Sequence, residues 1–96
     1  MNVSEAISAM KAGKRARLTT WGPTDPSFLV FVPGRLVVAS FPPMVNVLGE
    51  GVEFMSEDHI DAVYATVQGD QIVGASVCLG YQFRQAELMS DQWELV

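Results

Sequence analysis

His59 and Asp61 are the side chains whose types and spacing offer acid–base chemistry. They stand two residues apart in an alternating segment, so both would project from one face of a strand. A histidine beside a carboxylate can act as a general base with its orienting partner, or as two ligands of a metal ion. The chain has one histidine, no evident third ligand and no glycine-rich phosphate loop after a strand. We interpret the pair as a structural hydrogen bond and predict no catalysis, metal or cofactor.

Aromatic and cationic side chains offer binding chemistry instead. Trp21 follows Arg15 and Arg17 at intervals that place them on one face of a predicted strand, and Tyr64 and Tyr81 follow later in the chain. A planar base gains roughly 1–3 kcal/mol by stacking on an aromatic ring, and arginine binds phosphate. Trp21 has two interpretations that remain open: a plug in the core, or a platform for a base.

The N-terminal residues must position this cationic and aromatic set. Helical periodicity predicts a helix over residues 4–12, with Ser4 as its N-cap and Gly13 directly after its end. The period changes to two over residues 14–21, which predicts a strand. We therefore expect Arg17 on the polar face of that strand.

Two runs, 28–32 and 36–39, are apolar on both faces. Pro33-Gly34 between them predicts a hairpin. A sheet that faced water on one side would alternate, so the second face of these strands must also be covered. The cover is either the helix of a small core or another copy of the chain, and we favour another copy.

The C-terminal half predicts the remaining elements. Alternation on either side of Gly69-Asp70 indicates a second hairpin, a short helix follows, and the chain closes on a strand with Trp93 and Leu95 inward. These segments are 59–67, 72–79, 84–90 and 93–96. The fold class is α+β: an N-terminal helix packed on a twisted antiparallel sheet of several short strands, with a short C-terminal helix, in a homo-oligomer. We expect a single domain, 1–96.

Composition excludes some partners. The chain of 96 residues is 49% hydrophobic, 18% charged and has a net charge of -5, so long nucleic acid would be repelled. Cys78 lies in an apolar run and is expected as a buried thiol in a reducing compartment. The first residues lack the pattern of a signal peptide, and no apolar run is long enough to span a membrane.

Several short motifs, in the same order along nearly the whole chain, give a resemblance to a family of small phage and prophage proteins. The chain resembles the Thoeris anti-defence proteins of the second type. The matching segments are Asn2-Val3-Ser4-Glu5-Ala6 with Met10-Lys11-Ala12-Gly13-Lys14, then Trp21, Phe28 to Gly34, Phe41-Pro42-Pro43, His59-Ile60-Asp61, and Gln85 to Val96 with its Trp93 ending. Departures from the family are Gly22-Pro23 after the tryptophan and Gly74-Ala75 after Ile72-Val73.

This resemblance implies a sponge that binds cyclic ADP-ribose-type signals, or in some members cyclic dinucleotides, without degrading them. It implies a homotetramer with ligand pockets between protomers, at work in the cytoplasm of an infected bacterial cell. On this basis we assign Trp21 and Tyr81 to base stacking and Arg17 to phosphate, with Tyr81 in the place of a tryptophan that the family has. We assign His59, Asp61 and Gln85 to hydrogen bonds with ribose or base edges, or to bracing of the pocket.

Two other functions remain open. The first is an oligomeric accessory protein that inhibits a host protein through its acidic surface; it would bind a partner and no small molecule. The second is an enzyme that cleaves a nucleotide signal with His59 and Asp61; it would consume its substrate.

Overall fold

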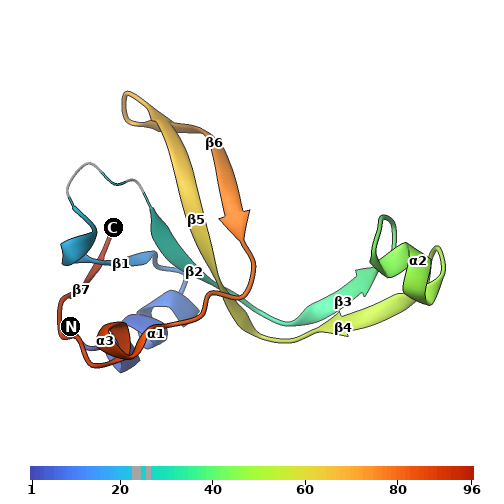
Figure 1. Ribbon diagram of the computed structural model, residues 1–96, viewed down its shortest axis with the longest axis horizontal. Helices are drawn as coiled ribbons and strands as arrows, with labels where there is room; N and C mark the ends of the chain where they lie inside the picture. Colours follow the sequence, from blue (N-terminus) through green and yellow to red (C-terminus); the bar gives the residue numbers. More distant parts are fainter. Residues whose placement is uncertain (23–24, 26) are drawn as a thin grey trace.

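Residues 1–22, 25 and 27–96 are described by the computed structural model, and within them five strands form the main sheet (Figure 1). Their spatial order is β6-β5-β2-β1-β7, and every neighbouring pair is antiparallel. The strands are β1 (Ala16–Leu18), β2 (Phe28–Val32), β5 (His59–Gln68), β6 (Gln71–Cys78) and β7 (Trp93–Leu95).

A second, two-stranded sheet and short helices complete the chain. The second sheet pairs β3 (Arg35–Val38) with β4 (Glu53–Ser56). The helices are α1 (Val3–Lys11), α2 (Met44–Leu48), α3 (Gln85–Leu88) and a 3-10 turn at Thr19–Trp21. The predicted α+β class is confirmed, and so are the N-terminal helix, the 59–67/72–79 hairpin, the short C-terminal helix and the last strand.

Helix α1 begins one residue earlier than predicted, and Asn2, not Ser4, is its N-cap. The Asn2 side chain accepts the Glu5 backbone N–H at 2.8 Å, and the Glu5 carboxylate accepts the Asn2 N–H at 3.0 Å. This reciprocal pair satisfies two backbone donors that a helix start leaves open. Gly13 follows the helix end with a φ of +94°, as its predicted role there requires.

The core lies between α1 and the sheet. Leu18 and Trp93 face each other across β1 and β7. They belong to one buried cluster, in which the helix side chains pack on strand residues: Ala6, Met10, Ala16, Leu18, Leu29, Ala62 and Trp93. The prediction that Trp93 is buried is confirmed. Leu95 is exposed, so the prediction that it points inward is wrong.

Arg17 is not on a solvent-facing strand surface. The predicted strand 14–21 shortens to β1, all three residues of β1 are buried, and the chain turns at once into the 3-10 helix that carries Trp21. Because β1 lies between β2 and β7, both of its edges are paired. The Arg17 side chain is therefore packed against the protein, and its long apolar stem makes this burial possible.

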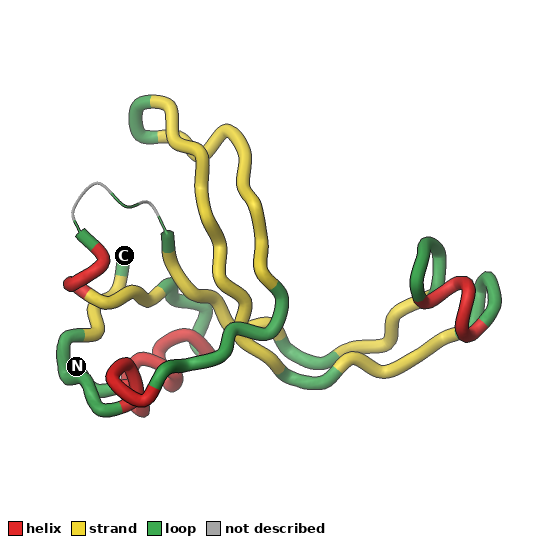
Figure 2. Tube along the Cα trace, in the orientation of Figure 1, coloured by secondary structure: helices red, strands yellow, loops and turns green. Residues whose placement is uncertain are grey.

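The predicted hairpin of 28–32 with 36–39 is wrong, because each run pairs with another segment. β2 pairs with β5, and β3 pairs with β4, so Val32 faces His59 and Arg35 faces Ser56. Pro33-Gly34 does not reverse the chain. It is a passage from the main sheet into an outlying ribbon, visible in Figure 2.

We call residues 35–56 the arm: β3, α2 and β4, which extend away from the main sheet (Figures 1 and 2). The radius of gyration is 15.7 Å, whereas a compact chain of this length has about 12.5 Å. Leu36 and Met55 on the arm are 63% and 67% exposed. Burial beneath the helix, one of the two alternatives, is therefore wrong for the run 36–39, whereas Leu29 of the run 28–32 is buried in the core with α1. Cover of the exposed strands by a second copy stays a prediction.

Strand β6 is an outer strand of the main sheet and is exposed along its whole length. Cys78 lies on it, so the expected buried thiol is exposed instead. The apolar run around Cys78 suggested burial, but the sheet offers no further strand or helix on that side within the described residues. Apolar type alone does not place a residue inside.

Candidate ligand-binding site

One cavity brings two of the predicted site residues together. It has a volume of about 360 Å³ and lies between the 3-10 turn, strands β2 and β5, and the segment from Tyr81 to Glu87. We call it the aromatic cavity. Its lining includes Trp21, Tyr64, Tyr81, Gln82, Arg84 and Glu87. The volume is at the lower end of the range for small-molecule pockets.

The Trp21 and Tyr81 rings meet the cavity on one side and the core on the other. Their centroids are 6.5 Å apart at an angle of 62°, and Trp21 lies edge-on to buried Trp93 at 6.0 Å. Phe83 continues the cluster, 5.2 Å from Tyr81 and 5.8 Å from Trp93. Edge-to-face pairs of this kind fix ring orientation. Trp21 thus packs on the core and lines the cavity, so its two interpretations coexist.

Hydrogen bonds at three atoms hold Tyr81. Its hydroxyl donates to the Glu87 carboxylate at 2.7 Å, and its backbone N–H donates to the Ile60 carbonyl on β5 at 2.7 Å. The preceding Gly80 N–H donates to the Asp61 carboxylate at 3.0 Å. Burial, followed by the hydrogen bond to Glu87 and its charge, raises the pKa of Tyr81 above its ordinary value. The phenol is therefore a neutral, fixed group.

His59 and Asp61 lie behind this aromatic wall and are not among the residues that line the cavity. The His59 Nε2 is 3.4 Å from the Asp61 carboxylate, and its Nδ1 is 2.7 Å from the Glu57 carbonyl. Asp61 is buried and anchors the turn before Tyr81. This geometry suits the bracing alternative of the predicted role rather than contact with a ligand.

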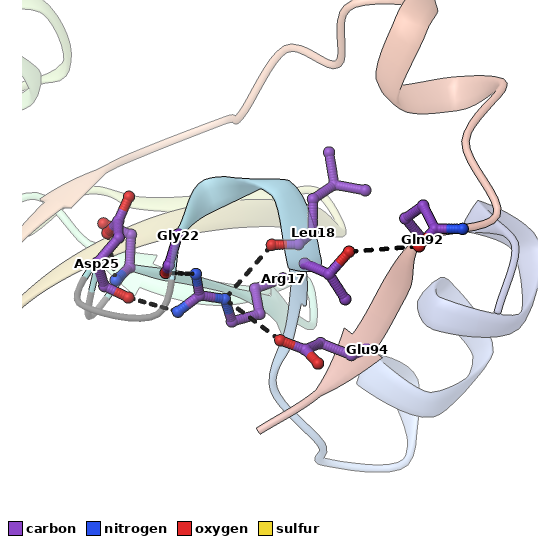
Figure 3. Close-up of polar contacts among 8 residues, drawn as sticks. Arg17, Leu18, Gly22, Asp25, Gln92 and Glu94 are labelled. Carbon is purple, nitrogen blue, oxygen red and sulfur yellow. Dashed lines mark hydrogen bonds and ion pairs between the residues drawn. The ribbon is translucent and has the colours of Figure 1, made fainter.

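Arg17 contacts the loop that follows Trp21. Its guanidinium donates to the carbonyls of Gly22 and Asp25, and its Nε lies 3.4 Å from the Leu18 carbonyl and 3.6 Å from the Glu94 carboxylate (Figure 3). These acceptors use most of the donors of the arginine fork. Arg17 does not line the aromatic cavity, and its contact with a phosphate stays a prediction.

Arg84 is the cation that lines the aromatic cavity, and the sequence did not single it out. It is exposed and directly precedes α3. Gln85, the predicted site residue, is exposed on α3 and is not a lining residue, whereas Gln82 is. No spacing signal could have found Arg84, because residues 81–84 form neither helix nor strand and their side chains follow no period.

A second cavity, of about 290 Å³, has a different character. Arg15 and Arg17 line it together with Asp25 and Asp70. The Arg15 guanidinium already covers the Phe28 ring, 4.8 Å from its centroid. Both cations of this cavity are thus already engaged, Arg15 by the Phe28 ring and Arg17 by the Gly22 and Asp25 carbonyls.

Neither a metal site nor a membrane span emerges from the described ranges. Among residues 1–22, 25 and 27–96, no three His, Cys, Asp or Glu side chains gather as metal ligands. No helix in those ranges is both long and apolar enough to cross a membrane.

Comparison with known proteins places the whole chain in one family. A family model described as the Thoeris anti-defense 2-like domain matches residues 1–96. Among curated proteins, none matches the chain. The match extends from α1 through the arm to β7 and so includes every element that forms the aromatic cavity. The chain therefore belongs to the Thoeris anti-defense 2-like family.

Proposed function

We propose that this protein is a non-enzymatic sponge, which binds a cyclic nucleotide immune signal in the aromatic cavity and sequesters it without degrading it, so that host antiviral signalling is blocked. The family name implies a role against the Thoeris defence. The signal would be of the cyclic ADP-ribose type or a cyclic dinucleotide, captured in the cytoplasm of an infected bacterial cell. The observation that carries the proposal is a cavity in which two aromatic rings and one arginine face the same space.

Each wall of the cavity suits a part of a nucleotide. Trp21 and Tyr81 offer ring surface to a base, and Arg84 offers a charge-assisted fork to a phosphate. Two carboxylates also line the cavity: Asp25, which accepts the Ser27 backbone N–H, and Glu87, which accepts the Tyr81 hydroxyl and the Arg84 backbone N–H. A phosphate would therefore lie on the Arg84 side, away from Glu87.

These contacts alone are too weak to account for the affinity of a tight sponge. Two stacked rings and one arginine–phosphate pair amount to roughly 4–9 kcal/mol before the cost of association. Even without that cost, this range corresponds to dissociation constants from about 1 mM to just below about 1 μM, whereas a tight sponge at about 1 nM needs about 12 kcal/mol. A second protomer over the cavity is the simplest source of the difference, which supports the homotetramer that the family resemblance implies.

Retention without chemistry also fits the position of His59 and Asp61. A general base must reach the reacting atom directly or through one water. Neither residue lines the cavity, and the Asp61 carboxylate is engaged by the Gly80 N–H. We assign them to bracing, and we expect a bound signal to be recovered intact.

Replacement of Trp21 tests the site. Trp21→Ala removes one stacking surface and should weaken binding of the captured cyclic nucleotide about tenfold to a hundredfold by calorimetry. Trp21→Phe keeps a flat ring and should retain most of the affinity. Circular dichroism should show that both variants are folded. Equal affinity of folded Trp21→Ala and the parent protein would remove the cavity from consideration.

The exposed arm favours one alternative, inhibition of a host protein by direct contact. Leu36 and Met55 offer apolar surface that a protein partner could cover as well as a second copy. In that case the protein would bind a host partner and give no heat with any cyclic nucleotide. Substitutions on the arm, and not in the cavity, would then abolish the effect.

A further inference from the structure

Glu87 connects two residues that line the cavity with the buried ring of Trp93. One carboxylate oxygen accepts the Tyr81 hydroxyl at 2.7 Å, and the other accepts the Arg84 backbone N–H at 2.8 Å. The Glu87 carbonyl accepts the Trp93 indole N–H at 3.0 Å. One residue on α3 thus contacts two rings of the aromatic cluster and the residue that bears the cavity's cation.

A charged side chain at position 87 carries a desolvation cost that lowers the free energy of unfolding. The residue is 8% exposed, and within the described part of the chain it forms no salt bridge. A buried carboxylate that is held by neutral donors costs desolvation free energy, which a glutamine of the same shape largely avoids. A glutamine at this third position of α3 could also accept the Arg84 N–H. What the charge adds is therefore a stronger hydrogen bond from the Tyr81 hydroxyl.

We propose that Glu87 is a positioning residue of the ligand site, which fixes the Tyr81 ring and the base of the Arg84 side chain through its two carboxylate oxygens. This inference rests on the proposed function, because it assigns Tyr81 and Arg84 to ligand contact. Glu87 itself stays in the wall.

The same contact determines what a ligand must present to Tyr81. The phenol has one donor, and Glu87 accepts it, so the oxygen faces the cavity as an acceptor. A ligand group at this point must therefore donate a hydrogen bond, as a base amino group or a ribose hydroxyl does. Anionic oxygens are directed to Arg84.

Ionisation of Tyr81 tests the contact without any ligand. The chain has two tyrosines, so Tyr64→Phe leaves Tyr81 as the one that is titrated. In this background, tyrosinate absorbance should show Tyr81 ionising above the ordinary value of about 10. Adding Glu87→Gln should lower that pKa, because the amide lacks the charge and presents a donor to the phenol oxygen. An unchanged titration would contradict the proposal whatever ligand is found.

Ligand binding tests the consequence. Calorimetry with cyclic ADP-ribose isomers and cyclic dinucleotides should show about tenfold weaker binding for Glu87→Gln and for Tyr81→Phe. The double variant should be little worse than either single one, because both remove the same contact. Asp91→Asn, which neutralises an exposed acid outside both the arm and the aromatic cavity, is the control and should bind as the parent does.

The outcomes separate the two proposals. If the parent protein binds none of these probes, the proposed function fails, and the titration alone still decides whether Glu87 fixes Tyr81. If the parent binds and folded Glu87→Gln binds equally well, the positioning role is overturned while the sponge stands. Additive losses in the double variant would also overturn it.

Discussion

Arg17 and Arg84 lie near the same aromatic cluster and have different tasks. Arg17 is buried on β1 and donates hydrogen bonds to loop carbonyls, whereas Arg84 is exposed and lines the cavity. The alternating pattern of the predicted strand indicated Arg17 as the cation beside Trp21, and the two residues are near each other in the sequence. The side on which its guanidinium finds acceptors depends on the loop fold, which spacing does not reveal.

Substitution of the two arginines should separate binding from stability. Arg84→Ala removes the cavity cation and should weaken nucleotide binding about tenfold to a hundredfold, with the free energy of unfolding changed by less than about 0.5 kcal/mol. Arg17→Ala removes the carbonyl contacts and should cost about 1–3 kcal/mol of stability. Calorimetry measures the nucleotide affinity of each variant, and urea unfolding measures its stability. An Arg84→Ala protein that binds as the parent does would exclude Arg84 from the site.

Tyr81 predicts a loss of stability in alkali. Because its pKa is raised in the folded protein, folding favours the neutral phenol. This contribution is complete below the unfolded tyrosine value of about 10 and falls as pH rises through the higher folded value. Tyr81→Phe should flatten the decline of the urea midpoint above about pH 10. The same slope in both proteins would show that Tyr81 is not the cause.

At the scale of the elements, the passage from the main sheet to the arm is the decisive joint. The Gly34 N–H donates to the Asp58 carboxylate at 2.6 Å, and Ser56 bonds to the backbone of Arg35. A Cβ on Gly34 would lie 2.5 Å from the Ser56 carbonyl oxygen. This close approach requires glycine, and it keeps β3 and β4 paired where the chain leaves the sheet.

Alanine at Gly34 should therefore loosen the arm. The two backbones must separate, so amide exchange in β3 and β4 should rise by at least about tenfold, and the free energy of unfolding should fall by about 1–3 kcal/mol. Gly74→Ala is the matched control, since its Cβ would meet the Thr66 Cβ at an ordinary 4.0 Å on exposed β6. Equal exchange in the two variants would contradict the role of this joint.

Local signals predicted several elements correctly and missed the pairing of two others. The 59–67/72–79 hairpin follows from alternation around Gly69-Asp70, and that turn has its glycine at a φ of +63°. Pro33-Gly34 carries an equally strong turn signal, but each flanking run pairs with a segment much farther along the chain, Val32 with His59 and Arg35 with Ser56. Helix α2 at the arm tip was missed, since its five residues follow Pro42-Pro43 and carry little periodicity. Pairing over such distances is decided by the whole sheet.

At the scale of the molecule, the extended arm leaves apolar side chains exposed on a single chain. A two-stranded ribbon with exposed apolar side chains is marginal by itself in water. Leu36, Val38 and Met55 are each more than half exposed along it. The sequence indicated this through strands that are apolar on both faces. What covers them lies outside one chain, so we propose a second copy.

Charges on the arm should dissolve the assembly. We expect the parent protein to sediment as a tetramer, and Leu36→Asp with Met55→Asp to sediment as smaller species with lower nucleotide affinity. Met89→Asp adds the same charge at an exposed methionine outside the arm and should leave the tetramer intact. A parent protein that sediments as a monomer, or a tetramer that survives the arm charges, would contradict this interface.

The most direct test of the sponge is calorimetry of the parent protein against cyclic ADP-ribose isomers and cyclic dinucleotides, followed by release of the bound ligand with heat and its identification by mass. We expect saturable binding of at least one of these signals at a fixed ratio to the protein, with the ligand recovered unchanged. A ligand recovered as an altered product would make the protein an enzyme, and no binding of any signal would contradict sequestration and favour direct inhibition of a host protein.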